Sequence, residues 1–179
     1  MIRFCNSCGA AVTHRIPDGD TLQRAVCDAC GMVHYQNPKV VVGCVPVYGD
    51  RILICKRAIE PRYGLWTLPA GFMENNETAG EGAAREALEE ANAKVEIEDL
   101  YTVYSIPTIS QVYMMFRARL VDPNVSPGAE SLEVKLVTGD EIPWDELAFS
   151  MVKRTLEHFL EDRKRGVFVP HFGDIRPPR

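Results

Sequence analysis

The sequence contains no long apolar run. Over its 179 residues, no segment approaches the roughly 18 uninterrupted apolar residues that a membrane-spanning helix needs. The first ten residues, MIRFCNSCGA, also lack the apolar stretch of a secretory signal. We therefore expect a cytoplasmic protein without a membrane partner.

Basic residues are too few to give the chain a positive surface. The sequence has 20 Lys and Arg against 25 Asp and Glu, for a net charge of -5 and a pI near 5.4. This balance argues against a broad electrostatic interaction with duplex nucleic acid. No nucleic-acid partner is expected, although a local basic pocket is compatible with this charge.

Cysteine is the residue whose placement carries most information near the N-terminus. Four of the six cysteines form a C-x2-C-x18-C-x2-C pattern, made by Cys5, Cys8, Cys27 and Cys30. In a chain without an export signal this spacing favours a metal site over disulfides. Gly9 and Gly31 follow the two pairs and let the backbone turn back toward the sulfurs. Residues 1–36 are therefore predicted to be a zinc ribbon.

The ribbon is too small to fold on apolar burial alone. A structural zinc ion with four thiolate ligands contributes roughly 10–16 kcal/mol of apparent binding free energy, which can replace a core. Reduced thiols without metal, or a redox pair, are the alternative reading of the same cysteines. Cys44 and Cys55 stand in apolar runs and are predicted to be ordinary buried thiols.

Residues 37–165 show the pattern of a mixed α/β domain. Two β-rich runs, VVVGCVPVY and RILICKR, are joined by Gly49-Asp50, a two-residue hairpin signal. Three further runs predict strands: AKVEIEDLYTVYSI, SQVYMMFRARLV and LEVKLVT. Helices are predicted from Thr78, which forms a capping box with Glu81, to about Ala91, and again over residues 150–165. The second helix is assigned to packing.

The last segment, 166–179, is expected to form no regular element. Its sequence, GVFVPHFGDIRPPR, contains three prolines. We expect it to lie across the surface of the domain or of a neighbouring subunit.

The first predicted helix places three carboxylates on one side. Each residue of a helix turns by about 100°, so Glu86, Glu89 and Glu90 lie within an arc of roughly 100°. Like charges so close repel one another, and oxygen-rich clusters suit Mg²⁺ or Mn²⁺. On spacing alone, a divalent-cation site and a solvated acidic face are both open.

The register of these residues resembles a known family signature. The spacing G-x5-E-x7-R-E-U-x-E-E, where U is aliphatic, is similar to the box of Nudix hydrolases and is made here by Gly71, Glu77, Arg85, Glu86, Glu89 and Glu90. Asn92 and Asn76 stand where members of the family often carry glycine. Both are expected to adopt left-handed backbone conformations, which asparagine tolerates best after glycine.

The resemblance extends over nearly the whole chain. The four-cysteine segment, YQNPK, the box, PGAESLE and DEIPWDELAFS together resemble a zinc-ribbon Nudix group that includes plant FAD pyrophosphatases and, more distantly, NADH pyrophosphatases. SIPTIS keeps only the outline of the motif S-Q-P-W-P-F-P-x-S, which argues against strict NADH specificity. The fold implied is an α/β class Nudix α/β/α sandwich with a mixed sheet, preceded by the ribbon and forming a homodimer.

The activity that the resemblance implies is divalent-metal-dependent hydrolysis of nucleoside diphosphates linked to a moiety X. The substrates would be small nucleotides of the FAD, ADP-ribose and NADH class, and the products AMP and phosphorylated X. Two alternatives are kept open: sanitation of damaged nucleoside triphosphates, and a nucleotide-binding sensor or binding module with little turnover.

Roles for individual residues also follow from the resemblance. Glu86 and Glu90 are implied as the main ligands of Mg²⁺ or Mn²⁺, with Glu89 assisting and the carbonyl of Gly71 or Ala70 as a further ligand. Glu77 and Arg85 would orient these carboxylates. The general base is expected at Glu130 or Glu133. Substrate contacts are expected among Arg57 and Arg62 for phosphates, and among Tyr63, Trp66, Phe72 and Tyr113 for stacking, unless these aromatics belong to the core.

Overall fold

The computed structural model describes residues 2–176, and its contacts divide the chain into two compact units at Asn37–Pro38. Among the described residues, no helix has the length and apolar character that a membrane crossing would require.

The N-terminal unit is a small antiparallel sheet beside a cluster of four cysteines. Its strands are β1 (Thr13–Arg15), β2 (Arg24–Val26) and β3 (Val33–His34), in the order β1-β2-β3. The ligand atoms of Cys5, Cys8, Cys27 and Cys30 all lie within 4.8 Å of one another. This arrangement fits four thiolates around one tetrahedral zinc ion. The predicted clustering of the four cysteines in the N-terminal unit is confirmed.

Two equivalent turns bring the cysteines together. The N–H of Gly9 donates to the carbonyl of Cys5 at 2.9 Å, and the N–H of Gly31 donates to that of Cys27 at 2.8 Å. Both glycines have positive φ, 76° and 75°, a conformation that other residues adopt only with strain. The glycine after each cysteine pair therefore serves the role expected from the sequence.

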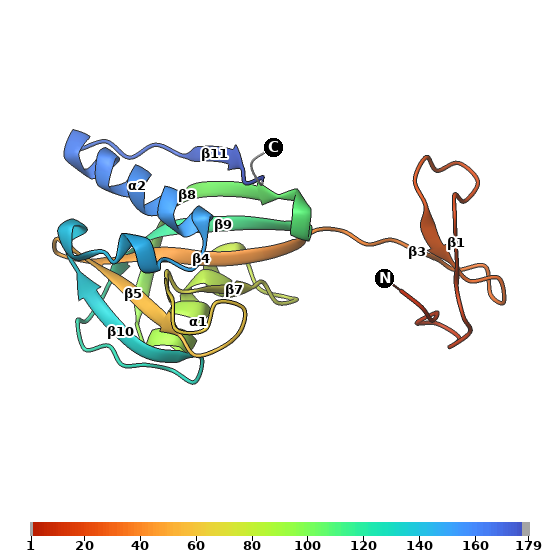
Figure 1. The fold of residues 1–179 in the computed structure, drawn as a ribbon, viewed down its shortest axis with the longest axis horizontal. Helices are drawn as coiled ribbons and strands as arrows, with labels where there is room; N and C mark the ends of the chain where they lie inside the picture. Colours follow the sequence, from red (N-terminus) through yellow and green to blue (C-terminus); the bar gives the residue numbers. More distant parts are fainter. Residues whose placement is uncertain (1, 177–179) are drawn as a thin grey trace. The chain divides into compact units, whose positions relative to one another are not determined.

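The C-terminal unit contains an eight-stranded mixed sheet with one helix on each face (Figure 1). The six main strands run in the order β10-β5-β4-β9-β8-β11, with β6 paired to β5 and β7 paired to β4. The pairs β4–β9 and β8–β11 are parallel and the others antiparallel. The strands are β4 (Lys39–Tyr48), β5 (Arg51–Arg57), β6 (Trp66–Thr67), β7 (Ala70–Phe72), β8 (Val95–Ile106), β9 (Gln111–Leu120), β10 (Ser131–Val137) and β11 (His171–Asp174).

The helices are α1 (Ala79–Ala91) and α2 (Ser150–Arg165), with short 3-10 turns at Pro107–Ile109, Gly139–Glu141 and Trp144–Glu146. Alternation along β5 shows how the sheet supports both layers. Ile52 and Ile54 belong to the core cluster that contains α2 residues, whereas Leu53 and Cys55 belong to the cluster that contains the alanines of α1. A strand buried on both faces requires this unbroken apolar run. The α/β/α sandwich is confirmed.

The prediction for the C-terminal segment was wrong in one respect. Residues His171–Asp174 form strand β11, which pairs in parallel with β8 at the edge of the sheet. Proline cannot donate a ladder hydrogen bond, but Pro170 immediately precedes the strand and none lies inside it. Counting prolines therefore misjudged a segment in which they flank the element.

We predict that the metal supports the N-terminal unit alone. Replacing Cys27 with Ser should abolish stoichiometric zinc binding, because three thiolates and a hydroxyl hold zinc far more weakly than four thiolates. The cooperative unfolding transition of residues 38–179 should remain, since both apolar clusters lie within that unit. Zinc content and thermal unfolding measure the two effects. Cys44→Ser is the control, because Cys44 lies outside the four-cysteine cluster, and it should leave the zinc content unchanged. Retention of zinc by Cys27→Ser would contradict the prediction.

Candidate active site

Helix α1 is closed at both ends by local interactions. The Thr78 hydroxyl accepts from the N–H of Glu81 at 3.2 Å, and the Glu81 carboxylate accepts from the N–H of Thr78 at 2.7 Å, which is the predicted capping box. Asn92 ends the helix with φ 49°, and Asn76 precedes it with φ 69°. The two asparagines therefore occupy the left-handed positions expected of them, and the loop geometry survives without glycine.

The loop that follows β9 is also attached to the end of α1. The side-chain amide of Asn92 donates to the carbonyl and hydroxyl oxygens of Ser126, both at 3.1 Å. The N–H of Gly128 donates to the carbonyl of Glu90 at 2.9 Å. A Cβ at Gly128 would lie 1.7 Å from the carbonyl oxygen of Glu89, so only glycine fits there. These contacts position Glu130, two residues further along, beside the helix.

Glycines also allow two segments to lie directly against the acidic face of α1. They are strand β7 and the loop between β7 and α1, which carries Glu77. A Cβ at Gly71 would lie 2.3 Å from Oε1 of Glu86, and a Cβ at Gly82 would lie 2.6 Å from Oε1 of Glu77. Any larger residue at either place would displace a carboxylate. The first glycine of the box is therefore required by the packing of the acids themselves.

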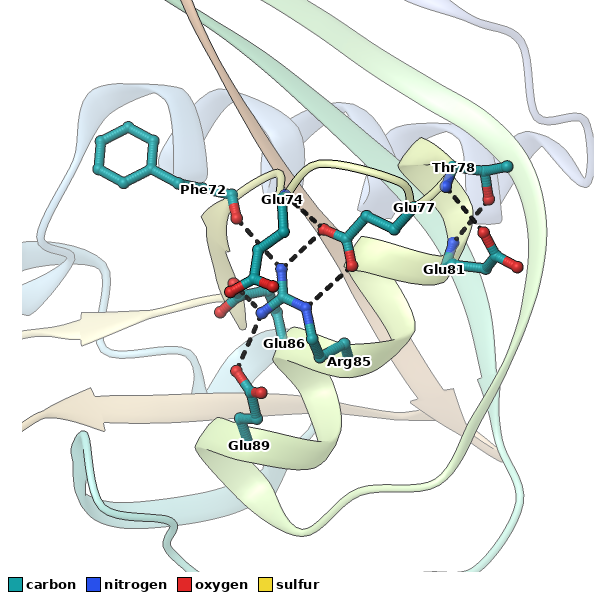
Figure 2. A network of polar contacts seen from close by, with 8 residues as sticks. All are labelled: Phe72, Glu74, Glu77, Thr78, Glu81, Arg85, Glu86 and Glu89. Carbon is teal, nitrogen blue, oxygen red and sulfur yellow. Dashed lines mark hydrogen bonds and ion pairs between the residues drawn. The ribbon is translucent and has the colours of Figure 1, made fainter.

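Arg85 links three of the carboxylates (Figure 2). Its Nε and Nη2 donate to the two oxygens of Glu77 at 3.0 and 2.9 Å, a bidentate pair. Its Nη1 donates to Glu86 at 2.7 Å and to Glu89 at 2.9 Å. Nη2 also donates to the carbonyl of Phe72 at 3.1 Å. All five of the guanidinium's short contacts therefore go to the acids and to β7.

Glu77 serves as the anchor of this network. Its Oε1 accepts from the N–H of Glu74 at 2.7 Å in addition to Arg85. Hydrogen bonds from Arg85 and from that backbone N–H lower the pKa of Glu77 to about 2. Glu77 is thus ionised throughout the physiological range and holds the guanidinium in place.

Glu86 and Glu90 are the buried members of the group. Their relative exposures are 8% and 6%. Burial raises the pKa of Glu86, and burial together with the charge of Glu86 raises the pKa of Glu90 to about 8. Arg85 pairs with Glu86, but among residues 2–176 no Lys or Arg forms an ion pair with Glu90.

A buried carboxylate without an ion-pair partner is costly, and the charge of Arg57 and a backbone hydrogen bond from Ala70 offset only part of the rise in the pKa of Glu90. Glu90 in particular therefore fits a site for a cation. Carboxylate and carbonyl oxygens are the donors that Mg²⁺ and Mn²⁺ prefer. The side chains of Glu86 and Glu90, and the backbone of Gly71 beside Glu86, supply that donor set. The residues present therefore fit the divalent ion that the resemblance to the Nudix box implies.

A cavity of about 1120 Å³ opens beside these acids. Its lining mixes charged groups of both signs with an extended apolar wall. The sequence-predicted residues that line it are Arg57, Arg62, Gly71, Phe72, Arg85, Glu86, Glu89, Glu90, Tyr113 and Glu130. Glu77 lies behind Arg85. The structure thus brings together, in one cavity, residues that the sequence distributes over 74 positions, from 57 to 130.

Trp66 and Glu133 are placed elsewhere. Trp66 is 4% exposed and belongs to the core, with Lys56 and Lys135 over its ring at 5.6 and 4.9 Å. Glu133 pairs with Lys135 at 2.9 Å, and the register of β10 shifts between Ser131 and Glu133. Neither side chain lines the cavity. Trp66 therefore belongs to the core, and Glu133 is a candidate base that lies outside the cavity.

Several lining residues carry no sequence signal for a site. They are apolar and come from the start of α2, from the loop between β8 and β9 and from the C-terminal segment: Phe149, Met151, Val152, Ile106, Ile109 and Ile175. Their chemistry suits a core as well as a cavity wall, so periodicity alone assigned α2 to packing. Only the tertiary fold shows that its first turn faces the cavity.

A mixed-sheet α/β/α sandwich with a carboxylate-bearing helix, preceded by a four-cysteine ribbon, defines the class of protein. Models for the Nudix N-terminal segment and for the NUDIX domain match residues 3–36 and 37–159. The chain therefore belongs to the Nudix family, with the zinc-ribbon N-terminal segment found in part of that family.

Individual relatives agree with this assignment. A crystal structure of a NUDIX hydrolase from Nitrosomonas europaea is 56% identical, with a TM-score of 0.96, and the match covers 98% of this chain and 100% of that one. An NAD-capped RNA hydrolase NudC from Stutzerimonas stutzeri is 27% identical over 135 residues, or 73% of this chain and 46% of that protein. An ADP-ribose pyrophosphatase from Methanocaldococcus jannaschii is 28% identical over 123 residues, or 66% and 72%. The chain thus spans about half the length of its NudC relative.

The buried charge of Glu90 predicts a pH-dependent stability. Its pKa of about 8 in the fold lies above the ordinary value of 4.5, so its contribution is fully present below about pH 4.5 and is lost as the pH rises through 8. Without added divalent ions, Glu90→Gln should raise the free energy of unfolding at pH 9 by on the order of 1–4 kcal/mol. At pH 5 the effect should be small. Urea unfolding at both pH values measures it.

Glu89→Gln is the matched control for this prediction, because the Glu89 side chain is 58% exposed. It should show no comparable gain at pH 9. An equal gain from Glu90→Gln at pH 5 and pH 9 would mean that charge burial is not the cause.

Proposed function

We propose that the protein is a divalent-metal-dependent pyrophosphatase that cleaves nucleoside diphosphates linked to a moiety X, releasing AMP and phosphorylated X. The observation that carries this proposal is the composition of the cavity. It combines buried carboxylates suited to a cation, arginines suited to phosphates and a long apolar wall. Its volume, about 1120 Å³, is at the upper end of small-molecule sites, which suits a ligand with two large groups.

The negative diphosphate must approach a site that is itself acidic. Glu86 and Glu90 would hold the cation, with the backbone at Gly71 beside them. When bound, a divalent ion neutralises phosphate oxygens and lowers the pKa of an attacking water. Arg85 keeps Glu86 and Glu89 oriented through its pairs with both, and Glu77 keeps Arg85 in place.

Arg57 and Arg62 are the side chains of the cavity lining that would bind phosphate oxygens. Nε of Arg57 donates to the carbonyl of Pro61 at 2.9 Å, and its guanidinium lies 5.2 Å from the ring of Phe149. These contacts hold the side chain at the cavity wall while its other N–H groups are available to a ligand. Phe72 and Tyr113 are the lining aromatics on which a base or ring can stack.

Glu130 is our candidate for the general base. In the reaction, the oxygen of a water molecule bonds to phosphorus, the bridging P–O bond breaks, and the bridging oxygen leaves with one product. The proton of the water passes to the Glu130 carboxylate. This residue lines the same cavity as Glu86 and Glu90, and the contacts of Asn92 and Gly128 hold its loop against the end of α1, which supports this role.

The substrates that this site favours are dinucleotide-like. The names of the two curated relatives, an NAD-capped RNA hydrolase and an ADP-ribose pyrophosphatase, both concern an adenosine diphosphate joined to another group. FAD, ADP-ribose and NADH belong to this chemical class. A damaged nucleoside triphosphate would leave the apolar wall largely uncovered, so sanitation is the less favoured reading.

We further propose that the ribbon holds structural zinc and supports assembly of a homodimer. Four thiolates leave zinc no open position for a substrate. The alternative of a nucleotide sensor with little turnover is disfavoured because all the box acids are present and Arg85 joins three of them, Glu77, Glu86 and Glu89.

The first functional prediction concerns products. With Mg²⁺ or Mn²⁺, the protein should release AMP from at least one of FAD, ADP-ribose, NADH and a short NAD-capped RNA, as measured by chromatography. Glu90→Gln should lower kcat by at least about 100-fold, because it removes a charged ligand of the ion. Glu161→Gln, which changes an exposed acid on α2, should leave kcat unchanged. Tight binding without product would favour the sensor.

The second functional prediction separates the two acids that the sequence left as candidates for the base. Glu130→Gln should lower kcat by about 10²–10⁴-fold without weakening Mg²⁺ binding, since it removes a proton acceptor and no ligand. Glu133→Gln, three residues away and outside the cavity, is the matched control and should have little effect. Steady-state kinetics and calorimetric titration with Mg²⁺ measure both. The opposite ranking would assign the base to Glu133.

A further inference from the structure

The C-terminal segment, residues 166–176, contributes to the cavity and is held by a buried carboxylate. After α2 the chain turns at Gly166, runs back along the sheet and adds β11 beside β8 (Figure 1). The N–H of Ile175 donates to the carbonyl of Ser105 at 2.9 Å. This pairing extends the ladder by one residue and places Ile175 in the cavity lining near Ile106.

Asp162 on α2 is the anchor of this segment. It is 2% exposed, and one of its oxygens, Oδ2, contacts three groups. The hydroxyl of Tyr101 donates to it at 2.9 Å, Nε2 of His171 lies 2.8 Å away, and the N–H of Val169 donates at 3.4 Å. Two of these three partners belong to the C-terminal segment. The carboxylate therefore joins helix, sheet and segment at one buried point.

The surroundings of His171 show that this contact is built into the core. Its ring stacks on that of His158 at 3.9 Å and meets the edge of the Tyr101 ring at 5.3 Å. Burial raises the pKa of Asp162, but the hydrogen bonds from His171 and Tyr101 outweigh it and leave that pKa below its ordinary value. Breaking the contact would remove one of the three partners of a buried charged group, which is costly.

Ile175 and the acids meet different parts of a ligand. Ile175 packs against the core cluster that contains Val152 and the rest of α2, whereas Glu86 and Glu90 stand on α1, whose alanines belong to the other cluster. Because all three side chains line one cavity, a ligand whose phosphates lie at the α1 carboxylates could contact Ile175 with one of the groups joined to its diphosphate.

From this juxtaposition, we propose that Ile175 is a specificity-determining residue for a group joined to the diphosphate, and that Asp162, through His171 and Val169, is a positioning residue that holds Ile175 in the cavity wall. The inference rests on the proposed function for the identity of the ligand. It assigns the C-terminal segment, whose sequence shows no site motif, to substrate recognition.

The first test truncates the Ile175 side chain in the cavity wall. Ile175→Ala should raise KM for ADP-ribose, or for the best substrate of the panel, about 5- to 20-fold, as expected for a lost apolar contact of a few methylene groups. Its kcat should change less than about 2-fold, since the reacting atoms lie elsewhere. Phe172→Ala is the matched control: Phe172 lies on the same segment but is 71% exposed and outside the cavity. Equal KM values for the two variants would overturn the proposal.

The second test replaces the anchor. Asp162→Asn should increase amide hydrogen exchange of residues 169–175 at least about 10-fold and raise KM in the same direction as Ile175→Ala. Glu161→Gln, its exposed neighbour, should change neither. If Asp162→Asn does not fold, Tyr101→Phe removes one donor from the same carboxylate and should show the same two effects more weakly. Unchanged exchange together with unchanged KM would remove Asp162 from this role.

Failure of the proposed function would be recognised separately. A wild-type protein that binds ADP-ribose in calorimetry but releases no AMP would refute the proposed pyrophosphatase activity. In that case, a weaker affinity of Ile175→Ala for ADP-ribose would still support the proposed role of Ile175. If the wild type turns over the substrate and Ile175→Ala has the same KM, only the proposed role of Ile175 would be refuted. A wild type that neither binds nor hydrolyses any compound of the panel would overturn both.

Discussion

The close approach of α1 to the sheet is the constraint on which this structure depends. Alanines at 83, 87 and 91 let the helix pack against β4, and Gly71 and Gly82 remove the last obstacles beside Glu86 and Glu77. The same closeness takes Glu86 and Glu90 out of water. Burial makes their charge costly, so the packing that forms the fold also creates a place where a cation is favoured.

Arg85 offsets part of the cost of burying this negative charge. A guanidinium has five N–H donors in a fixed plane, and here they reach Glu77, Glu86, Glu89 and the carbonyl of Phe72. A lysine, with a single charged nitrogen, could not reach four groups in these directions. Glu90 lies beyond this network, which leaves one buried carboxylate for a ligand to satisfy.

The cavity is assembled from segments that meet only in the folded chain. The loop carrying Glu130 is tied to the C-terminal end of α1 through Asn92 and Gly128. The first turn of α2 and Ile175 complete the apolar wall. Charged groups near one helix thus share a cavity with an apolar wall to which the opposite layer contributes.

Residue type and spacing by themselves predicted the four-cysteine ribbon, the order of most elements and the capping box of α1, because these features depend on local periodicity and ligand chemistry. The roles of the acids at 77, 86, 89 and 90 came from the resemblance to the Nudix box, since spacing alone also allowed a solvated acidic face. Only the tertiary structure decided that Trp66 and Glu133 lie outside the cavity, that α2 and Ile175 line it and that residues 171–174 form a strand. Apolar side chains look alike in a core and in a cavity wall, and a strand's edge position depends on a partner distant in sequence. Local patterns therefore identify the chemistry, whereas packing decides which residues share the cavity with it.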